Sequence, residues 1–314
     1  MTTTIQHLNI TNILDAVKGT IISDNLSNFK AGTGALNTFT TGSFNTAVGT
    51  NPLNNNTTGI ANTAFGSSAL ISNNVGNFNT AVGTFVLPNN TSGTNNTAMG
   101  YEALLSNVSG NFNTAIGNEA MLNNIVGNFN TAIGNIALYN DTSGSFNTAV
   151  GSGSLFGNTT GVGNVGIGSG ALEYNTVGNY NTAIGYGSLQ ADASGYIGNR
   201  NTAVGFYAGK FVNLGNLNTF IGNNTGASIV NGVNNLCLGN GADLGTDTSN
   251  SVIIGNNLIS SLSINGTKTG NDPLLYLPQV SPPSASSFGT ATNALPISVN
   301  GVVYYLPLYD GYTP

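Results

Sequence analysis

The chain has 314 residues, of which 5% are charged, against about 25% in an ordinary globular domain. Its net charge of −6, from 5 Lys and Arg against 11 Asp and Glu, excludes the positive surface that binding to a phosphate backbone requires, so no nucleic-acid partner is expected. Apolar residues make up 39% of the chain and recur at fixed positions, which argues against disorder.

Residues 1–27 precede the repetitive part of the chain, and we interpret them as an N-terminal attachment or capping segment. Residues 1–8 lack a basic region followed by an apolar run, and no stretch of 18 apolar residues occurs, so neither a secretory signal nor a membrane span is predicted. Apolar residues at near-helical spacing in 13–19 follow Thr11, a suitable N-cap, so a short helix or strand is expected there.

Residues 28–255 contain one recurring motif, Asn-Thr-Ala-(Val/Ile/Phe/Met)-Gly. Its asparagine recurs every 17 residues, with one step of 20. The positions are Asn45, Asn62, Asn79, Asn96, Asn113, Asn130, Asn147, Asn164, Asn181, Asn201, Asn218 and Asn235. Degenerate first and last copies at 28–32 and 251–255 give about fourteen coils, as the capping of a solenoid predicts.

Three further columns keep the same phase. A glycine column runs through Gly42, Gly59, Gly76, Gly93, Gly110, Gly127, Gly144, Gly161 and Gly178. A leucine column runs through Leu36, Leu53, Leu70, Leu87, Leu104, Leu138, Leu155, Leu172 and Leu189, with Met121 in its one gap. An asparagine column runs through Asn56, Asn73, Asn90, Asn107, Asn124, Asn158 and Asn175, with Asp141 as its one exception. Such agreement excludes coincidence and establishes the period.

The repeat predicts an all-β fold, because 17 residues are too few for two helices and their turns, and each copy has glycine at two or more fixed positions. Around the first full motif, Phe44, Thr46 and Val48 alternate with Asn45 and Ala47. Each copy is therefore expected to form one coil of a parallel β-roll, with a short strand, a glycine turn, a second segment around Ala-Leu, and a return turn.

Stacked coils place identical residues above one another, which explains the composition. Asparagine ladders satisfy their own amides along the axis, whereas identical charges one coil apart would repel. At about 4.8 Å per coil, fourteen coils would form a rod of roughly 65–70 Å. Because each coil of small residues buries a narrow core, we expect several chains to associate along their length.

Residues 256–290 lack the period and are rich in Ser and Pro, which predicts a linker and transition. Residues 291–314 form a separate unit, in which two alternating segments flank Asn300-Gly301, a strong hairpin signal. The expected pairs are Val299 with Val302, Ile297 with Tyr304 and Leu295 with Leu306. A lone hairpin is not stable in water, so its apolar face is expected to meet the same hairpin of sister chains.

Three tyrosines of this last unit, Tyr305, Tyr309 and Tyr312, are candidates for contact with a receptor or glycan. Burial in a trimer interface is the alternative explanation for them, and the one that we favour. No other binding residues, and no cofactor, are predicted.

The sequence does not predict an enzyme, because its one histidine, His7, lies outside the repeat and its acids fall at non-equivalent repeat positions. The single cysteine, Cys237, rules out an intrachain disulfide framework and occupies the alanine position of the motif, which predicts a small buried residue. Asp141 has no second acid in register with it, so it is interpreted as a residue of a solvated turn and no metal site is predicted.

A regular column of hydroxyl groups raises a further alternative, an ice-binding solenoid. The column is Thr46, Thr63, Thr80, Thr97, Thr114, Thr131 and Thr148. Flat ice-binding faces carry paired ranks of threonine, whereas the neighbours here are aromatic and aliphatic residues such as Phe44 and Val48, so this interpretation ranks low.

The pattern Asn-Thr-Ala-(Val/Ile)-Gly-x-x-Ala-Leu resembles the head repeats of trimeric autotransporter adhesins, the YadA-like parallel β-roll, over residues 28–255. Similar repeats occur in phage tail fibres and in surface proteins of large viruses. The resemblance implies a left-handed roll, a homotrimer, and a role in adhesion or display without catalysis. The period of 17 departs from the usual period of about 14 in adhesin heads, so the return turn is longer.

A trimeric autotransporter would also have a signal peptide, a coiled-coil stalk and a membrane strand domain, none of which is evident here. A chain that starts at Met1 with end segments of its own favours a virion fibre, spike or decoration protein at the virion surface. We expect one end to contact other virion proteins, and a host receptor or glycan to be a further partner. A bacterial surface adhesin head at the cell surface is the first alternative.

Overall fold

The computed structural model describes residues 22–23, 26–36, 40–191, 198–256, 291–299 and 302–309. The chain divides into two compact units, residues 1–256 and residues 257–314. The predicted helix or strand at 13–19 and the predicted linker at 256–290 lie outside the described residues, apart from Asn256.

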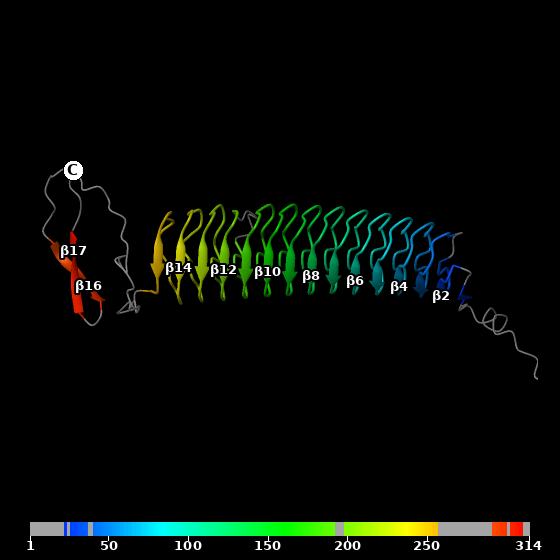
Figure 1. Ribbon diagram of the computed structural model, residues 1–314, viewed down its shortest axis with the longest axis horizontal. Coiled ribbons are helices and arrows are strands. Elements are labelled where there is room, and N and C mark those ends of the chain that lie inside the picture. Colours follow the sequence, from blue (N-terminus) through cyan, green and yellow to red (C-terminus); the bar gives the residue numbers. More distant parts are fainter. Residues whose placement is uncertain are drawn as a thin grey trace, which may run out of the picture. The chain divides into compact units, whose positions relative to one another are not determined.

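The first unit contains a single sheet whose strands follow one another in chain order, with one strand in each coil (Figure 1). The strands are β1 (Ile22–Ser23), β2 (Phe29–Ala31), β3 (Thr46–Val48), β4 (Thr63–Phe65), β5 (Thr80–Val82), β6 (Thr97–Met99), β7 (Thr114–Ile116), β8 (Thr131–Ile133), β9 (Thr148–Val150), β10 (Val165–Ile167), β11 (Thr182–Ile184), β12 (Thr202–Val204), β13 (Thr219–Ile221), β14 (Leu236–Leu238) and β15 (Val252–Ile254). From β2 to β15 all neighbours are parallel, whereas β1 pairs with β2 antiparallel. The predicted β-solenoid is confirmed, including its degenerate first and last copies at β2 and β15.

Equivalent residues of successive coils pair with one another. Thr46 pairs with Thr63, and Ala47 pairs with Ala64. The register passes unchanged through the longer step of 20 residues, where Thr182 pairs with Thr202. A shift of one residue would turn every buried side chain outward, so this repeated register fixes which side chains form the core.

The core lies inside the coils and consists of two apolar columns. The central alanine of the motif is fully buried in strand after strand, and so is the leucine column from Leu53 to Leu189, with Met121 in its gap. Because each coil buries these residues within a single chain, the solenoid has a continuous core along its length.

The motif asparagines form a buried ladder beside this core. The backbone N–H of Asn62 donates to Asn45 Oδ1 at 2.9 Å, and Asn62 Nδ2 donates to the carbonyl of Gly76 at 2.8 Å. Asn79 repeats both contacts one coil further on. These bonds satisfy the amides that burial would otherwise leave without partners, which is why asparagine recurs at this position.

The second segment of each coil, around Ala-Leu, has an unusual backbone conformation. Its leucines adopt left-handed backbone conformations, with φ of 49° at Leu53 and 53° at Leu104. The N–H of Leu53 still bonds to the next coil, at the carbonyl of Ala69. This conformation is unfavourable for leucine, so burial of the side chain and the bond between coils must offset its cost.

The glycine that ends each motif is required by the spacing of the coils. At Gly100 the φ angle is 135°, and a Cβ atom there would lie 2.3 Å from the carbonyl oxygen of Gly117 in the next coil. Any other residue would have to displace the backbone. The glycine therefore permits both the turn after the strand and the close stacking of coils.

The second unit contains a β-hairpin of β16 (Ala291–Val299) and β17 (Val302–Tyr309). Its antiparallel register pairs Val299 with Val302, Ile297 with Tyr304 and Leu295 with Leu306. These pairs confirm the register predicted from the Asn-Gly turn.

Candidate functional site

The outward side of the parallel sheet carries a row of mostly apolar side chains, which we call the apolar stripe. It consists of the residue after the central residue of each motif, which is apolar in every coil, and of the residue before the motif asparagine where that residue is apolar. The second column is interrupted by Asn95, Gly163, Arg200 and Asn234. Its most exposed members are Phe44, Phe65, Phe78, Met99, Phe112, Phe129, Phe146, Tyr180, Leu217, Ile221 and Ile254. Phe44 is 68% exposed and Phe146 is 60% exposed, although both belong to a regular repeat. Exposed apolar surface of this extent indicates an interaction surface.

The aromatic part of the stripe is ordered along the axis. The ring centroids of Phe112 and Phe129 lie 4.9 Å apart, and those of Phe129 and Phe146 lie 5.0 Å apart. In both pairs the ring planes are within 5° of parallel. Stacking fixes these rings before any partner arrives, so a partner meets a preformed surface.

The threonine column lies within this surface, between the two apolar columns. Thr46 and Thr114 are partly buried, whereas Asn45 and Ala47 point into the coil and are buried. The predicted alternation along the strand is therefore confirmed. The hydroxyl groups are flanked by aromatic and aliphatic side chains on both sides.

Cys237 is the central residue of β14 and is fully buried, as predicted from the alanine position. Burial raises the pKa of its thiol to about 11, and the carboxylate of Asp243 adds to the shift. The thiol therefore stays protonated at neutral pH, and a protonated thiol is neither a good nucleophile nor a metal ligand.

Asp141 does not lie in a solvated turn, contrary to the sequence-based interpretation. It is fully buried in the asparagine column, where its Oδ1 accepts bonds from Asn158 Nδ2 at 2.8 Å and from the N–H of Gly144 at 3.1 Å. Burial raises the pKa of this carboxyl to about 7, although the two hydrogen bonds lower it. Asp141 therefore occupies the same buried position in its turn as the asparagines of the neighbouring coils.

Two buried oxygens at this point of the ladder have no hydrogen-bond partner. One is Oδ2 of Asp141 itself, and the other is Oδ1 of Asn124 in the preceding coil. In a regular rung the asparagine amide donates to the preceding oxygen, as Asn124 Nδ2 does to Asn107 Oδ1 at 2.9 Å. A carboxylate has no proton to donate, so the ladder is interrupted here unless Asp141 is protonated.

The three candidate tyrosines belong to the second unit. Tyr305 pairs with Pro296 and Tyr309 pairs with Ala291 across the hairpin, and Tyr312 lies outside the described residues. In the part of the chain that the structure describes, no three His, Cys, Asp or Glu side chains are grouped so that they could hold a metal ion. No described segment is a helix of the length and apolarity that crossing a membrane requires.

Sequence reasoning missed one further surface, a groove on the side of the coils that follows the leucine column. It is lined by Ser106, Asn123, Ile125, Asn140, Thr142, Phe156, Gly157, Thr159, Tyr174 and Thr176. The sequence does contain one indication of this groove. In the column two residues after the leucine column, Gly157 and Tyr174 come after a run of Asn and Ser. Because the residue type varies in this column, the 17-residue period alone does not reveal it.

In comparisons with known proteins, no family model, no curated protein and no solved structure matches the chain. The resemblance to adhesin head repeats therefore depends on the motif residues alone.

Proposed function

We propose that this chain is a structural fibre or surface-decoration protein of a virus particle, built from three copies packed along their solenoids. The resemblance of residues 28–255 to β-roll repeats of adhesin heads and viral fibres suggests the class. The observation that carries the proposal is the apolar stripe, which follows the sheet from Phe44 to Ile254.

Other copies of the same chain are the partners that best fit this stripe. The column after the central motif residue repeats with every coil, so a partner that covers the stripe along its length must repeat with the same spacing. A sister chain does so without adjustment, and with 5% charged residues in the chain, few charges are available to repel it. Burial of one large aromatic side chain contributes about 1.5–3 kcal/mol, and the contribution recurs at many coils.

The ends of the chain provide the attachment points of such a fibre. One end contacts other proteins of the virion, and the hairpin of Ala291–Val299 and Val302–Tyr309 is the unit that sister chains pack together. Two strands alone are marginally stable in water, which favours assembly of this unit with its copies. Attachment to a host surface is the role that suits the distal part of the fibre.

Light scattering of the purified full-length protein tests the assembly. The expected particle mass is three times 31.8 kDa. Replacement of Phe112, Phe129 and Phe146 by aspartate places three charges on the apolar stripe, and we expect this variant to run as a monomer. The matched control carries the same three charges on exposed return turns, at Thr58, Ser92 and Ser143, and should remain a trimer.

A wild-type protein that is monomeric at micromolar concentration would overturn the fibre assembly, and so would a triple stripe variant that keeps the full mass. Location is tested separately with gold-labelled antibody against the solenoid. Labelled virus particles support the virion role, whereas labelled bacterial cell envelopes would replace it with the adhesin role.

A further inference from the structure

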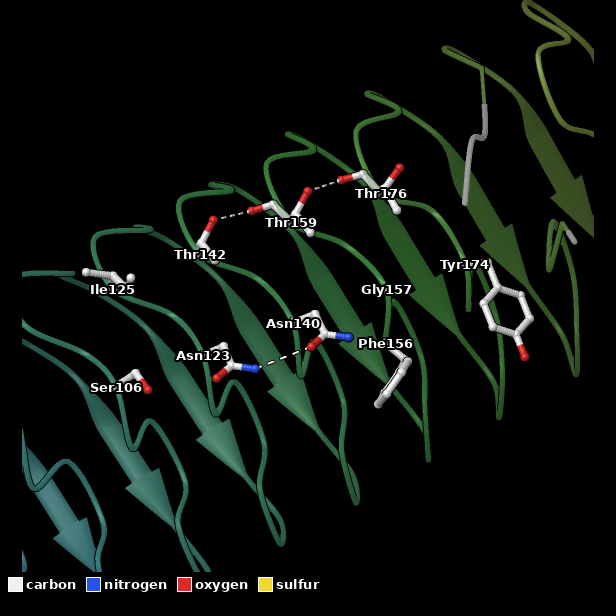
Figure 2. A pocket seen from close by; sticks show the side chains of 10 residues that line it. All are labelled: Ser106, Asn123, Ile125, Asn140, Thr142, Phe156, Gly157, Thr159, Tyr174 and Thr176. Carbon is white, nitrogen blue, oxygen red and sulfur yellow. Dashed lines mark hydrogen bonds between the residues drawn. The ribbon is translucent and has the colours of Figure 1, made fainter. Parts of the chain in front are cut away.

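A groove runs along one side of the coils, between two columns of side chains (Figure 2). One wall is the column of Ser106, Asn123, Asn140, Gly157 and Tyr174, here called the amide wall. The other is the column of Ile125, Thr142, Thr159 and Thr176, here called the threonine wall. The groove has a volume of about 520 Å³, which lies within the range of roughly 300–1,000 Å³ of small-molecule sites.

The amide wall is interrupted at Gly157. Asn123 Nδ2 donates to Asn140 Oδ1 at 3.3 Å, which continues the amide row by one coil. The next residue in the row is Gly157, which has no side chain, and Figure 2 shows the Asn140 amide nitrogen pointing toward it. Among the described residues this nitrogen donates to no acceptor, so a hydrogen-bond donor faces the notch that the glycine leaves.

The threonine wall presents acceptors. Thr142 Oγ1 donates to the carbonyl of Thr159 at 3.0 Å, and Thr159 Oγ1 donates to the carbonyl of Thr176 at 2.9 Å. Because each hydroxyl proton is already used, the lone pairs of these two oxygens are what a ligand meets. The bonds along the axis also hold both side chains in place before a ligand binds.

Two aromatic rings lie next to the notch. Phe156 precedes Gly157 in the chain, and its ring is held by stacking on Tyr139 at 5.3 Å between centroids. Tyr174 follows one coil later and takes the place of the amide in the row (Figure 2). The charge of Glu173, burial and a hydrogen bond to the Glu173 side chain raise the pKa of the Tyr174 phenol, so what Tyr174 offers to the notch is its ring.

None of the ten lining residues is ionisable at neutral pH, and the two carboxyl residues that adjoin them in the sequence, Asp141 and Glu173, bring no positive charge. A sulfated, phosphorylated or sialylated ligand would find no cation here. A ligand with many hydroxyl groups, an apolar face of C–H bonds and no charge matches the donor, the acceptors and the two rings.

We propose that this groove binds a neutral saccharide, with one sugar ring seated in the Gly157 notch against Phe156 and Tyr174. Its hydroxyl groups accept from the Asn140 amide and donate to Thr142 and Thr159. The inference deepens the proposed attachment role and takes its biological meaning from it, but the binding itself does not depend on how the chains assemble.

The test measures binding of neutral oligosaccharides to the full-length protein by saturation-transfer NMR and calorimetry. The probes are glucose-, galactose-, mannose- and N-acetylhexosamine-terminated oligosaccharides, with sialylated and sulfated versions and an unglycosylated Ser/Thr-rich peptide as comparisons. We expect at least one neutral probe to bind and the charged versions to bind more weakly.

Three variants locate the site. Gly157→Asn continues the amide row into the notch, and we expect binding to fall at least tenfold. Its matched control is Ser72→Asn, the same side chain at the equivalent position of a coil outside the groove, which should bind like wild type. Asn140→Ala removes the donor and Tyr174→Ala removes the ring, and each is expected to weaken binding about five- to tenfold.

A Cβ atom at Gly157 would lie 3.0 Å from the carbonyl oxygen of Glu173, so folding of the Gly157→Asn variant is checked by circular dichroism. If that variant does not fold, Asn140→Ala and Tyr174→Ala decide the question. No binding of any neutral probe, preference for a charged probe or for the peptide, or binding that the variants leave unchanged would each overturn the proposal.

Light scattering of the same samples separates this inference from the proposed function. A trimer that binds no saccharide would support the fibre assembly and overturn the proposed saccharide site. A monomer whose saccharide binding is lost in Gly157→Asn would support the saccharide site and overturn the assembly.

Discussion

The interior of the solenoid is built in two different ways along the chain. From Asn56 to Asn175 the coils contain a buried ladder of asparagine amides beside the leucine column, in which Asn90 Nδ2 donates to Asn73 Oδ1 at 2.8 Å. In the coils after residue 201 the same ladder position is occupied by Val212 and Ile229, both fully buried. Hydrogen bonds between amides therefore stabilise this position in the first set of coils, and apolar packing stabilises it in the second.

The leucine column changes in the same coils. Gly209 and Gly226 replace the leucines, and Phe220 replaces the alanine at the centre of β13. A Cβ atom at Gly226 would lie 2.2 Å from the Phe220 ring, and one at Gly209 would lie 2.7 Å from it. The ring therefore fills the volume that two leucines fill elsewhere, and the substitutions compensate one another.

The strand pairing and the ladder of motif asparagines are unchanged in these coils. Phe220 pairs with Ala203 on one side and Cys237 on the other, in the register of every other coil. The motif asparagines also continue, since Asn218 Nδ2 donates to Asn201 Oδ1 at 3.1 Å. The coil is thus specified by its backbone pairing, its motif asparagine and its turn glycine, while the interior needs only to be filled and satisfied.

Removal of the Phe220 ring should have the largest effect on stability. Phe220→Ala leaves a cavity between two glycines, and we expect a loss of about 3–5 kcal/mol of unfolding free energy. The measurement is chemical denaturation at fixed protein concentration, because assembly contributes to apparent stability.

The sharper form of this experiment converts these coils to the other interior. In the triple variant Phe220→Ala, Gly209→Leu and Gly226→Leu, each leucine takes a position with φ near 60°, close to the φ of 49° at Leu53. We expect it to recover most of the lost stability. If it is no more stable than Phe220→Ala alone, the two interiors are not interchangeable and the compensation argument is wrong.

The period of the sequence was sufficient to predict the strands, the buried alanine, leucine and asparagine columns, and the outward side of the sheet. Each is a property of a column, and a column is visible in one sequence when its residue type repeats. The hairpin register was predictable for a different reason, because Asn300-Gly301 fixes the turn and therefore the pairing.

Properties that depend on neighbouring coils were not predictable. A left-handed leucine contradicts its own backbone preference, and only the stacked coils make Leu53 and Leu104 adopt it. Asp141 was interpreted as part of a solvated turn because no second acid is in register with it, whereas the ladder around it holds the side chain in the buried position of an asparagine. The groove arises where Gly157 meets rings from its own coil and the next, which no single column reveals.

The Asp141 rung gives the second largest expected effect, and one that depends on pH. The pKa of this carboxyl is raised from 3.8 to about 7 in the folded chain. Below about pH 4 it is protonated in both the folded and the unfolded states, and its contribution is fully present. As the pH rises toward 7 the unfolded chain loses the proton first, so the unfolding free energy falls, by an amount on the order of a few kcal/mol.

Asp141→Asn restores an amide that can donate to Asn124 Oδ1, and we expect it to remove this pH dependence and to be more stable than wild type at pH 8. The measurement is denaturation at pH 4, 6 and 8, with Asp247→Asn as a control, since the pKa of Asp247 is lowered and its contribution changes with pH in the opposite sense. A wild-type stability that rises between pH 4 and pH 7 would contradict the protonated rung.

The smallest expected effect tests whether the apolar interior can be transferred into the amide coils. Asn107→Val introduces the side chain of position 212 into the ladder. It removes the donor to Asn90 Oδ1, which lies at 2.8 Å, and the acceptor of Asn124 Nδ2. A buried polar atom without a partner costs about 1–3 kcal/mol, so we expect a loss of that size despite the good apolar fit of valine.

The control for that substitution is Ile229→Val, which changes volume in the apolar interior without touching a hydrogen bond and should cost about 0.5–1.5 kcal/mol. If Asn107→Val costs no more than this control, the amides contribute nothing beyond filling space. If it costs more, extension to Asn90→Val with Asn107→Val should cost less than twice the single change, because the second valine removes the oxygen that the first left without a partner.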